Sequence, residues 1–188
     1  MPLRSAAAAV TRMAVQDMLG ADIETSGVWD PLRLSKDDGN LFKYREVELK
    51  HGRVAMLATL GVLVQSFNHL PDPVFSNPRP LAALSQILAE RPVAFWQIFL
   101  AVGAFELSIG KQDYENKAPG DIATFGDFVK PSDEDEWEKI QLRELKNGRL
   151  AMVASIGMFV QEALTGQGPI EQLQVGHISP FGDGSGFF

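Results

Sequence analysis

Apolar residues gather into three runs along the chain, and polar or proline-rich segments separate them. The runs cover Val54–Val64, Pro92–Phe105 and Leu150–Val160. Each is long enough for a helix, but none reaches the ~18 apolar residues that identify a membrane-spanning helix unaided. The mean hydropathy of −0.03 is low for a membrane protein. Length and hydropathy alone therefore leave both a membrane protein and a soluble helical bundle open.

The first and third runs belong to an internal repeat. Residues 48–65 read ELKHGRVAMLATLGVLVQ and residues 144–161 read ELKNGRLAMVASIGMFVQ, with 11 identities in 18 positions at a constant offset of 144 − 48 = 96. A repeat of this kind constrains the whole architecture. In a helix, the polar start of each copy and the small residues after it share one face. We assign Gly61, Gly157 and the alanines of the repeats to close helix packing.

The repeats predict a first helix from near Tyr44 to Phe67 and a last helix after the acidic run Asp133–Glu138. The acidic run favours the positive end of that helix. A middle helix is predicted over 92–110, because the missing N–H of Pro92 is harmless in a first turn. The segments at 29–32, 71–80 and 166–169 carry Pro, Gly and Asp and are predicted to be turns or loops.

Topology favours the membrane interpretation. Equivalent repeats related by an axis along the membrane normal cross in the same direction, so an odd number of crossings must separate them, and only the middle segment is available. The pattern predicts an all-α membrane protein with three transmembrane helices, the first and third crossed and related by internal two-fold pseudo-symmetry. We expect an N-terminal extension and loop over 1–43, a three-helix domain over 44–165 and a C-terminal tail over 166–188. Residues 1–16, basic and without acid, fit either a remnant of a plastid-type targeting sequence or a flexible tail.

Charge and composition exclude several classes of function. The formal charge is 17 − 24 = −7 and the basic residues form no stripe, so nucleic acid is not an expected partner. The chain has no Cys. Disulfides, Cys-based zinc sites and thiol catalysis are therefore excluded, while the redox compartment stays undetermined.

Each repeat places a Glu and an Arg at the mouth of an apolar helix, where a charge is costly to bury unless it is paired. In two crossed helices Glu48 would meet Arg149, and Glu144 would meet Arg53. Pairing within each helix or plain solvation is the alternative. The recurrence of both residues in both copies favours the reciprocal pairs, and a Glu neutralised in this way keeps lone pairs for a metal.

Neutral donors lie three residues after each Glu, and a Gln closes each copy. The donors are His51 in the first copy and Asn147 in the second. Glu48 and His51 form the Glu-x-x-His motif of a di-iron carboxylate bundle, which requires a second such motif. Asn147 breaks that motif in the second copy. A chlorophyll magnesium requires less, because its macrocycle leaves one axial position that a single Glu, His, Asn or Gln can fill.

These residues resemble a known family, the three-helix chlorophyll-binding light-harvesting proteins of plastids. The likeness covers roughly residues 28–181 and rests on WDPL at 29–32, on both E-L-K-x-G-R-x-A-M repeats and on the middle helix. The resemblance implies reciprocal Glu–Arg pairs and chlorophyll ligands at Glu48, His51, Gln97, Glu106, Glu144, Asn147 and Gln161. Repeat symmetry adds Gln65. His177 resembles a ligand on a short segment after the last helix, with a plain surface histidine as the alternative, and His69 is not expected to be a ligand.

The short connectors and the ending GHISPFGDGSGFF resemble the algal branch of the family, which uses chlorophyll a and chlorophyll c with fucoxanthin or peridinin. The resemblance implies these chlorophylls together with carotenoids of the fucoxanthin, peridinin or diadinoxanthin type. The carotenoids are expected near turns such as Trp29–Leu32 and Phe125–Phe128.

The implied function is to capture light and pass excitation energy to a photosystem, which requires no covalent chemistry, so we do not expect an enzyme. The expected location is the plastid thylakoid membrane, with lipids, a photosystem core and neighbouring antenna subunits as partners. Photoprotective quenching uses the same ligands and stays an alternative. A soluble metal-carboxylate enzyme is the alternative from another class, and Asn147 is the main argument against it.

Overall fold

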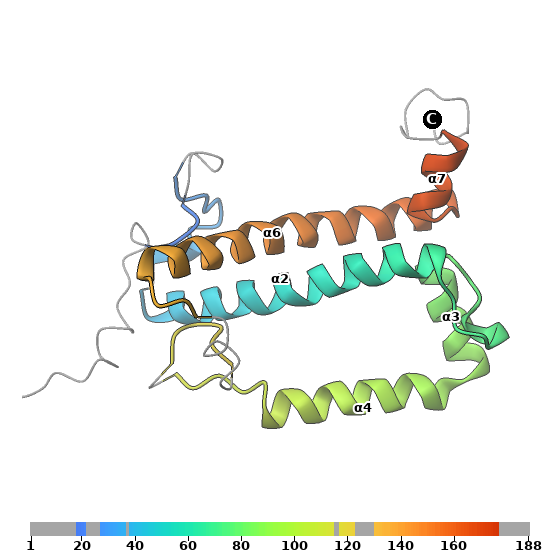
Figure 1. Cartoon of the computed structure of the whole chain (residues 1–188), viewed down its shortest axis with the longest axis horizontal. Coiled ribbons are helices and arrows are strands. Elements are labelled where there is room, and N and C mark those ends of the chain that lie inside the picture. Colours follow the sequence, from blue (N-terminus) through green and yellow to red (C-terminus); the bar gives the residue numbers. More distant parts are fainter. Residues whose placement is uncertain (1–17, 22–26, 37, 115–116, 123–129, 177–188) are drawn as a thin grey trace, which may run out of the picture. The chain divides into compact units, whose positions relative to one another are not determined.

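The computed structural model describes residues 18–21, 27–36, 38–114, 117–122 and 130–176. This part of the chain is helical and contains no strand, which confirms the all-α prediction for it. Figure 1 labels its helices, which are α2 (Asp38–Phe67), α3 (Pro80–Glu90), α4 (Pro92–Ser108), α6 (Glu134–Thr165) and α7 (Pro169–Val175). Two short 3-10 turns, η3 (Leu34–Lys36) and η4 (Pro73–Phe75), lie before α2 and before α3.

The two repeats lie in α2 and α6. Helix α2 ends at Phe67 as predicted but begins at Asp38, before the predicted start near Tyr44. Leu41 and Phe42 are buried, so tertiary packing stabilises a first turn that the repeat pattern does not reveal. Helix α6 begins inside the acidic run and carries Glu134, Asp135 and Glu136 in its first turn, where negative charge favours the positive helix end.

Helix α3 was not predicted, because Pro80 was assigned to a loop. Pro80 instead occupies the first turn of α3, where no N–H is required. The carboxylate of Glu162 on α6 caps this helix and accepts hydrogen bonds from the backbone N–H of Leu81 at 2.9 Å and of Ala82 at 3.1 Å. A cap supplied from so far along the chain leaves no local signal in the sequence.

Helix α7 corrects the prediction of a tail after residue 169. Gly166 makes the predicted turn with a left-handed φ of +66°, and its N–H donates to the Glu162 carbonyl at 2.8 Å. Helix α7 then begins at Pro169. The Glu171 carboxylate accepts two hydrogen bonds from the guanidinium of Arg79, at 3.1 and 3.0 Å, and so ties α7 to the residue before α3.

The WDPL segment forms the predicted turn. The Asp30 carboxylate accepts from the backbone N–H of Leu34 at 3.0 Å and of Ser35 at 2.7 Å, which starts η3. Hydrogen bonding by Ser35 is the main reason that the pKa of Asp30 is lowered. Arg33 adopts a left-handed φ of +56° in the turn.

The chain divides into two compact units. The first comprises Met1–Arg53 with Ala104–Arg149, and the second comprises Val54–Gly103 with Leu150–Phe188. In the first unit the backbones of α2 and α6 meet at Gly52 and Gly148. In the second unit the capped start of α3 and the Arg79–Glu171 ion pair hold the short helices in place.

Large apolar side chains stay exposed along α4, none of whose residues is buried. Examples are Val93, Trp96, Phe99, Leu100 and Leu107. By length and apolar composition alone, no single helix in the described part of the chain is identified as a membrane span, while α3 and α4 together are identified as a candidate span that is bent by 108°.

Candidate functional site

Reciprocal ion pairs join the two repeats in the first unit. The Nε of Arg53 on α2 lies 2.6 Å from Oε1 of Glu144 on α6, and the Nε of Arg149 on α6 lies 2.7 Å from Oε1 of Glu48 on α2. Glu48 has a second partner, since Nη1 of Arg45 lies 3.1 Å from its Oε2. Both glutamates therefore have their charge compensated, and the side chains of Glu144 and Glu48 are 32% and 27% exposed.

Each repeat arginine also binds a glycine carbonyl. Nη1 of Arg53 donates to the Gly120 carbonyl at 2.6 Å, and Nη1 of Arg149 donates to the Gly20 carbonyl at 2.7 Å. Both glycines adopt left-handed φ, +81° and +89°. A Cβ at Gly120 would collide with Leu49 on α2, so glycine is required for both the conformation and the close approach.

Sequence reasoning missed these two glycines. A signal was present, because GADI at 20–23 and GDI at 120–122 occur before the first and second repeats. The two glycines are 120 − 20 = 100 residues apart, not 96, so they lie outside the ungapped repeat. Each arginine binds the glutamate of the other repeat and the glycine that precedes the other repeat.

The side chains of His51 and Asn147 are each held by a hydrogen bond to the backbone of their own helix. Nδ1 of His51 lies 2.8 Å from the Val47 carbonyl, and Nδ2 of Asn147 donates at 2.8 Å to the Arg143 carbonyl, in both cases four residues earlier on the same helix. A carbonyl can only accept, so Nδ1 of His51 carries a hydrogen, and in the neutral imidazole Nε2 then has the lone pair. In Asn147 the same bond leaves Oδ1 as the acceptor. Both side chains are exposed, and each therefore offers one oriented acceptor atom to the surroundings.

The glutamines that close the repeats lie in the second unit. Nε2 of Gln65 donates to the Asn77 carbonyl at 2.8 Å, which orients the amide and leaves Oε1 as an acceptor. Asn77 is itself held, because its Oδ1 accepts from the N–H of Arg79 at 3.0 Å. Gln161 on α6 is exposed, as is Gln97 on α4.

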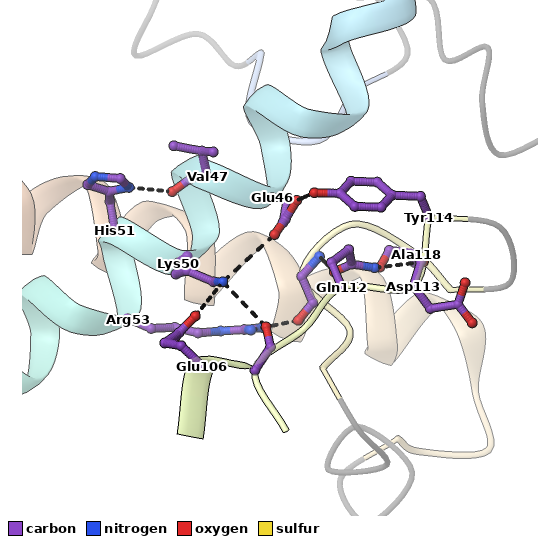
Figure 2. A network of polar contacts seen from close by, with 12 residues as sticks. Glu46, Val47, Lys50, His51, Arg53, Glu106, Gln112, Asp113, Tyr114 and Ala118 are labelled. Atoms are coloured by element: carbon purple, nitrogen blue, oxygen red, sulfur yellow. Dashed lines mark hydrogen bonds and ion pairs between the residues drawn. The ribbon is translucent and has the colours of Figure 1, made fainter. Parts of the chain in front are cut away.

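Glu106 on α4 has a partner that sequence reasoning missed. Figure 2 shows its carboxylate beside the ammonium of Lys50 on α2, with Oε2 and Nζ 2.8 Å apart. Glu106 is 41% exposed, so part of the carboxylate faces outward. Among the expected ligands, Glu48, His51, Glu106, Glu144 and Asn147 thus belong to the first unit and Gln65, Gln97 and Gln161 to the second.

Two expectations lie outside the described residues, namely His177 and the turn Phe125–Phe128. The other expected turn is described, and its Trp29 and Leu32 side chains are each 77% exposed. His69, which was not expected to be a ligand, is exposed in the loop before η4.

The expected ligand side chains that the structure describes do not form a cluster. In the described part of the chain, no three His, Asp or Glu side chains come together in a group able to hold a metal ion. The arrangement therefore lacks the carboxylate and histidine cluster of a di-iron bundle. The described acceptor atoms instead lie separately on helix surfaces, and they are neutral or charge-compensated.

Comparison with known proteins identifies the family. The sequence model described as chlorophyll A-B binding protein matches residues 6–163, and the chain belongs to this family. A fucoxanthin-chlorophyll a-c binding protein of Chattonella marina var. antiqua is 50% identical over 180 residues, covering 93% of this chain and 82% of that protein. A fucoxanthin-chlorophyll a-c binding protein E of Macrocystis pyrifera is 36% identical, covering 83% and 78%.

The similarity extends to a land plant. Chlorophyll a-b binding protein 6 of Arabidopsis thaliana is 36% identical over 163 residues, covering 77% of this chain and 64% of that protein. The algal and plant proteins are all named chloroplastic. The family resemblance inferred from the two repeats is confirmed.

Proposed function

We propose that this protein is a light-harvesting antenna that binds chlorophyll a, chlorophyll c and carotenoids of the fucoxanthin type and passes excitation energy to a photosystem. The matched orientation of His51 and Asn147 carries the proposal. The names of the similar algal proteins supply the pigment types and the plastid location. The bound pigments supply light absorption and the excited states, so the function requires no catalytic step from the chain.

The donor set fits chlorophyll magnesium. A bound chlorophyll would supply the macrocycle nitrogens to its magnesium, and one nitrogen or oxygen donor of the protein would complete the coordination. His51 would bind through Nε2, Asn147 through Oδ1 and Gln65 through Oε1, because the other polar atom of each side chain is held by a backbone carbonyl. Fixing the second atom of a ligand in this way sets its orientation and favours metal binding.

The glutamate ligands require charge compensation, because an unpaired carboxylate is costly in an apolar setting. Glu144 receives Arg53 on Oε1, and we assign magnesium to its remaining lone pairs. Glu48 receives Arg149 on Oε1 and Arg45 on Oε2. Each oxygen has two lone pairs, so Glu48 also keeps an acceptor site, although a more crowded one.

We further propose the membrane arrangement predicted from the repeats, with α2 and α6 crossed and α4 as the middle spanning helix. The exposed apolar side chains of α4 support it, since a surface of this kind suits lipid or pigment better than water. Gly61 and Gly157 support it as well. Each occupies the same repeat position, and a Cβ at either would meet no atom of the described chain within 4 Å, which leaves open helix surface for a flat pigment.

Ligand replacement tests the proposal. The chain is reconstituted with chlorophyll a, chlorophyll c and fucoxanthin as wild type, His51→Leu, Asn147→Leu and His69→Leu, and chlorophylls per polypeptide are counted. His51→Leu and Asn147→Leu should each lose one chlorophyll while the helical content is kept, because neither removes a charge partner. His69→Leu is the matched control and should lose none. Unchanged counts for His51→Leu and Asn147→Leu would overturn both assignments.

A further inference from the structure

Lys50 lies between two carboxylates in the first unit. It is not one of the residues that the sequence analysis expects to bind pigment. Its Nζ lies 2.8 Å from Oε2 of Glu106 on α4 and 3.8 Å from Oε1 of Glu46 on α2. It also donates to the Gly110 carbonyl at 3.4 Å. Lys50 therefore connects α2 to the end of α4.

Lys50 carries one positive charge and lies near two carboxylates, and the distances indicate which carboxylate it pairs with. Glu46 is buried at 8% exposure, and its Oε2 accepts a hydrogen bond from the Tyr114 hydroxyl at 2.7 Å. That bond raises the pKa of Tyr114, so the hydroxyl stays protonated and continues to donate. Tyr114 thereby satisfies much of the Glu46 carboxylate, and Lys50 lies closer to Glu106.

Glu106 lacks a repeat arginine. The arginines of the repeats, Arg53 and Arg149, are both engaged by Glu144 and Glu48. The Glu106 carboxylate lies against Gly110, since a Cβ there would be 3.1 Å from its Cδ and from its Oε2. Oε1 of Glu106 is left as the oxygen that does not face Lys50.

We propose that Lys50 is the charge partner that lets Glu106 bind a chlorophyll magnesium, and that Tyr114 positions Lys50 by holding Glu46. This inference rests on the proposed antenna function. Lys50 does for Glu106 what Arg53 does for Glu144: it compensates the carboxylate and leaves lone pairs free for the metal. Lys50 is thus a positioning residue, and it does not itself touch the pigment.

The test separates charge compensation from a structural role. Variants Lys50→Met, Glu106→Gln and the double variant are reconstituted with chlorophyll a, chlorophyll c and fucoxanthin, beside Glu106→Ala and the control Lys43→Met, an exposed lysine of the same helix. Glu106→Ala and Lys50→Met should each lose one chlorophyll. Glu106→Gln should keep it, because a neutral amide oxygen needs no partner. The double variant should also keep it, since removing the carboxylate charge removes the need for Lys50.

A double variant that loses as much chlorophyll as Lys50→Met would overturn the proposal, because Lys50 would then act through packing. A full count for Lys50→Met, or for Glu106→Ala, would also overturn it. In the second case the losses caused by His51→Leu and Asn147→Leu would still support the antenna function, so the two failures are distinguishable.

A second readout does not depend on pigment. The rate at which Lys50 is acetylated by a water-soluble active ester, followed by mass spectrometry with Lys43 as internal reference, should rise severalfold in Glu106→Ala.

The role of Tyr114 is tested by the chlorophyll count. In Tyr114→Phe the freed Glu46 should draw Lys50 away, and the chlorophyll at Glu106 should be partly lost. An unchanged acetylation rate in Glu106→Ala, or a full chlorophyll count in Tyr114→Phe, would contradict the assigned network.

Discussion

Gly52 of α2 and Gly148 of α6 lie backbone against backbone. A Cβ at Gly52 would stand 3.0 Å from Cα of Gly148, and one at Gly148 would stand 3.1 Å from Cα of Gly52. The two glycines occupy the same position in the two repeats, so the contact is symmetric. It sets the distance between the helices that carry the Glu–Arg pairs.

Gly52→Ala should therefore destabilise the complex. Forcing a methyl group into this contact costs about 1–3 kcal/mol, against a helix-propensity gain of about 0.5–1 kcal/mol for replacing Gly. Thermal unfolding of the reconstituted complex, followed by far-ultraviolet circular dichroism, measures the balance. Gly103→Ala in α4 is the control, because a Cβ there meets nothing in the described chain within 4 Å. Equal destabilisation by both variants would show that the close contact is not at Gly52.

Loss of one partner of a reciprocal Glu–Arg pair should destabilise the fold and also weaken pigment binding by the glutamate. Arg53 and Glu144 are 36% and 32% exposed, so the cost lies between that of an exposed pair and that of a buried one. We expect about 2 kcal/mol for Arg53→Leu. The variant deletes no ligand, yet reconstitution yield and chlorophyll count should both fall below those of the exposed control Arg143→Leu. Full yield with all chlorophyll would contradict the role of the pair.

The capped start of α3 should depend on Glu162. Glu162→Ala leaves the N–H groups of Leu81 and Ala82 without their acceptor, and loss of such a cap costs about 1–2 kcal/mol. Hydrogen exchange at these two amides should accelerate roughly tenfold, while the exposed control Glu138→Ala should not change it. Glu162→Gln keeps one acceptor oxygen and should lie in between. Unaltered exchange in Glu162→Ala would mean that the cap does not hold α3.

The stability of α7 should depend on pH through the Arg79–Glu171 ion pair. The hydrogen bond from Arg79, and then that from the Gly168 N–H, lowers the pKa of Glu171 below its ordinary value of 4.5. A carboxylate with a lowered folded-state pKa contributes stability that is complete above pH 4.5 and lost as the pH falls through the lowered value. Both side chains are about 40% exposed, so the contribution is about 0–1 kcal/mol.

The rate of amide hydrogen exchange in α7 is measured in Glu171→Gln and in the wild type at each pH. The ratio of the two rates checks this dependence, because the intrinsic effect of pH on exchange cancels. The ratio should exceed one at neutral pH and approach one in acid. A ratio that is the same at every pH would exclude a contribution from Glu171.

The repeats made much of the site predictable, because residues that recur in two equivalent helices must face each other in equivalent ways. Glu106 lies outside that symmetry, since the partner of a middle-helix carboxylate depends on how α4 packs, and the repeat does not reveal that Lys50 pairs with it. The small residues show the same limit. Gly52 and Gly61 are both repeat glycines, and the assignment of Gly61 and Gly157 to close helix packing was wrong, because the crossing point lies at Gly52 and Gly148. Helix α3 escaped prediction because Glu162 caps it from a distant helix.

Energy transfer between bound pigments tests the central claim most directly. The protein is purified in mild detergent, and the excitation spectrum of chlorophyll a fluorescence is compared with the absorption spectrum. The account predicts carotenoid and chlorophyll c bands in the excitation spectrum, and their loss when the protein is unfolded. A colourless protein, or one whose carotenoid band is absent from the excitation spectrum, would contradict it.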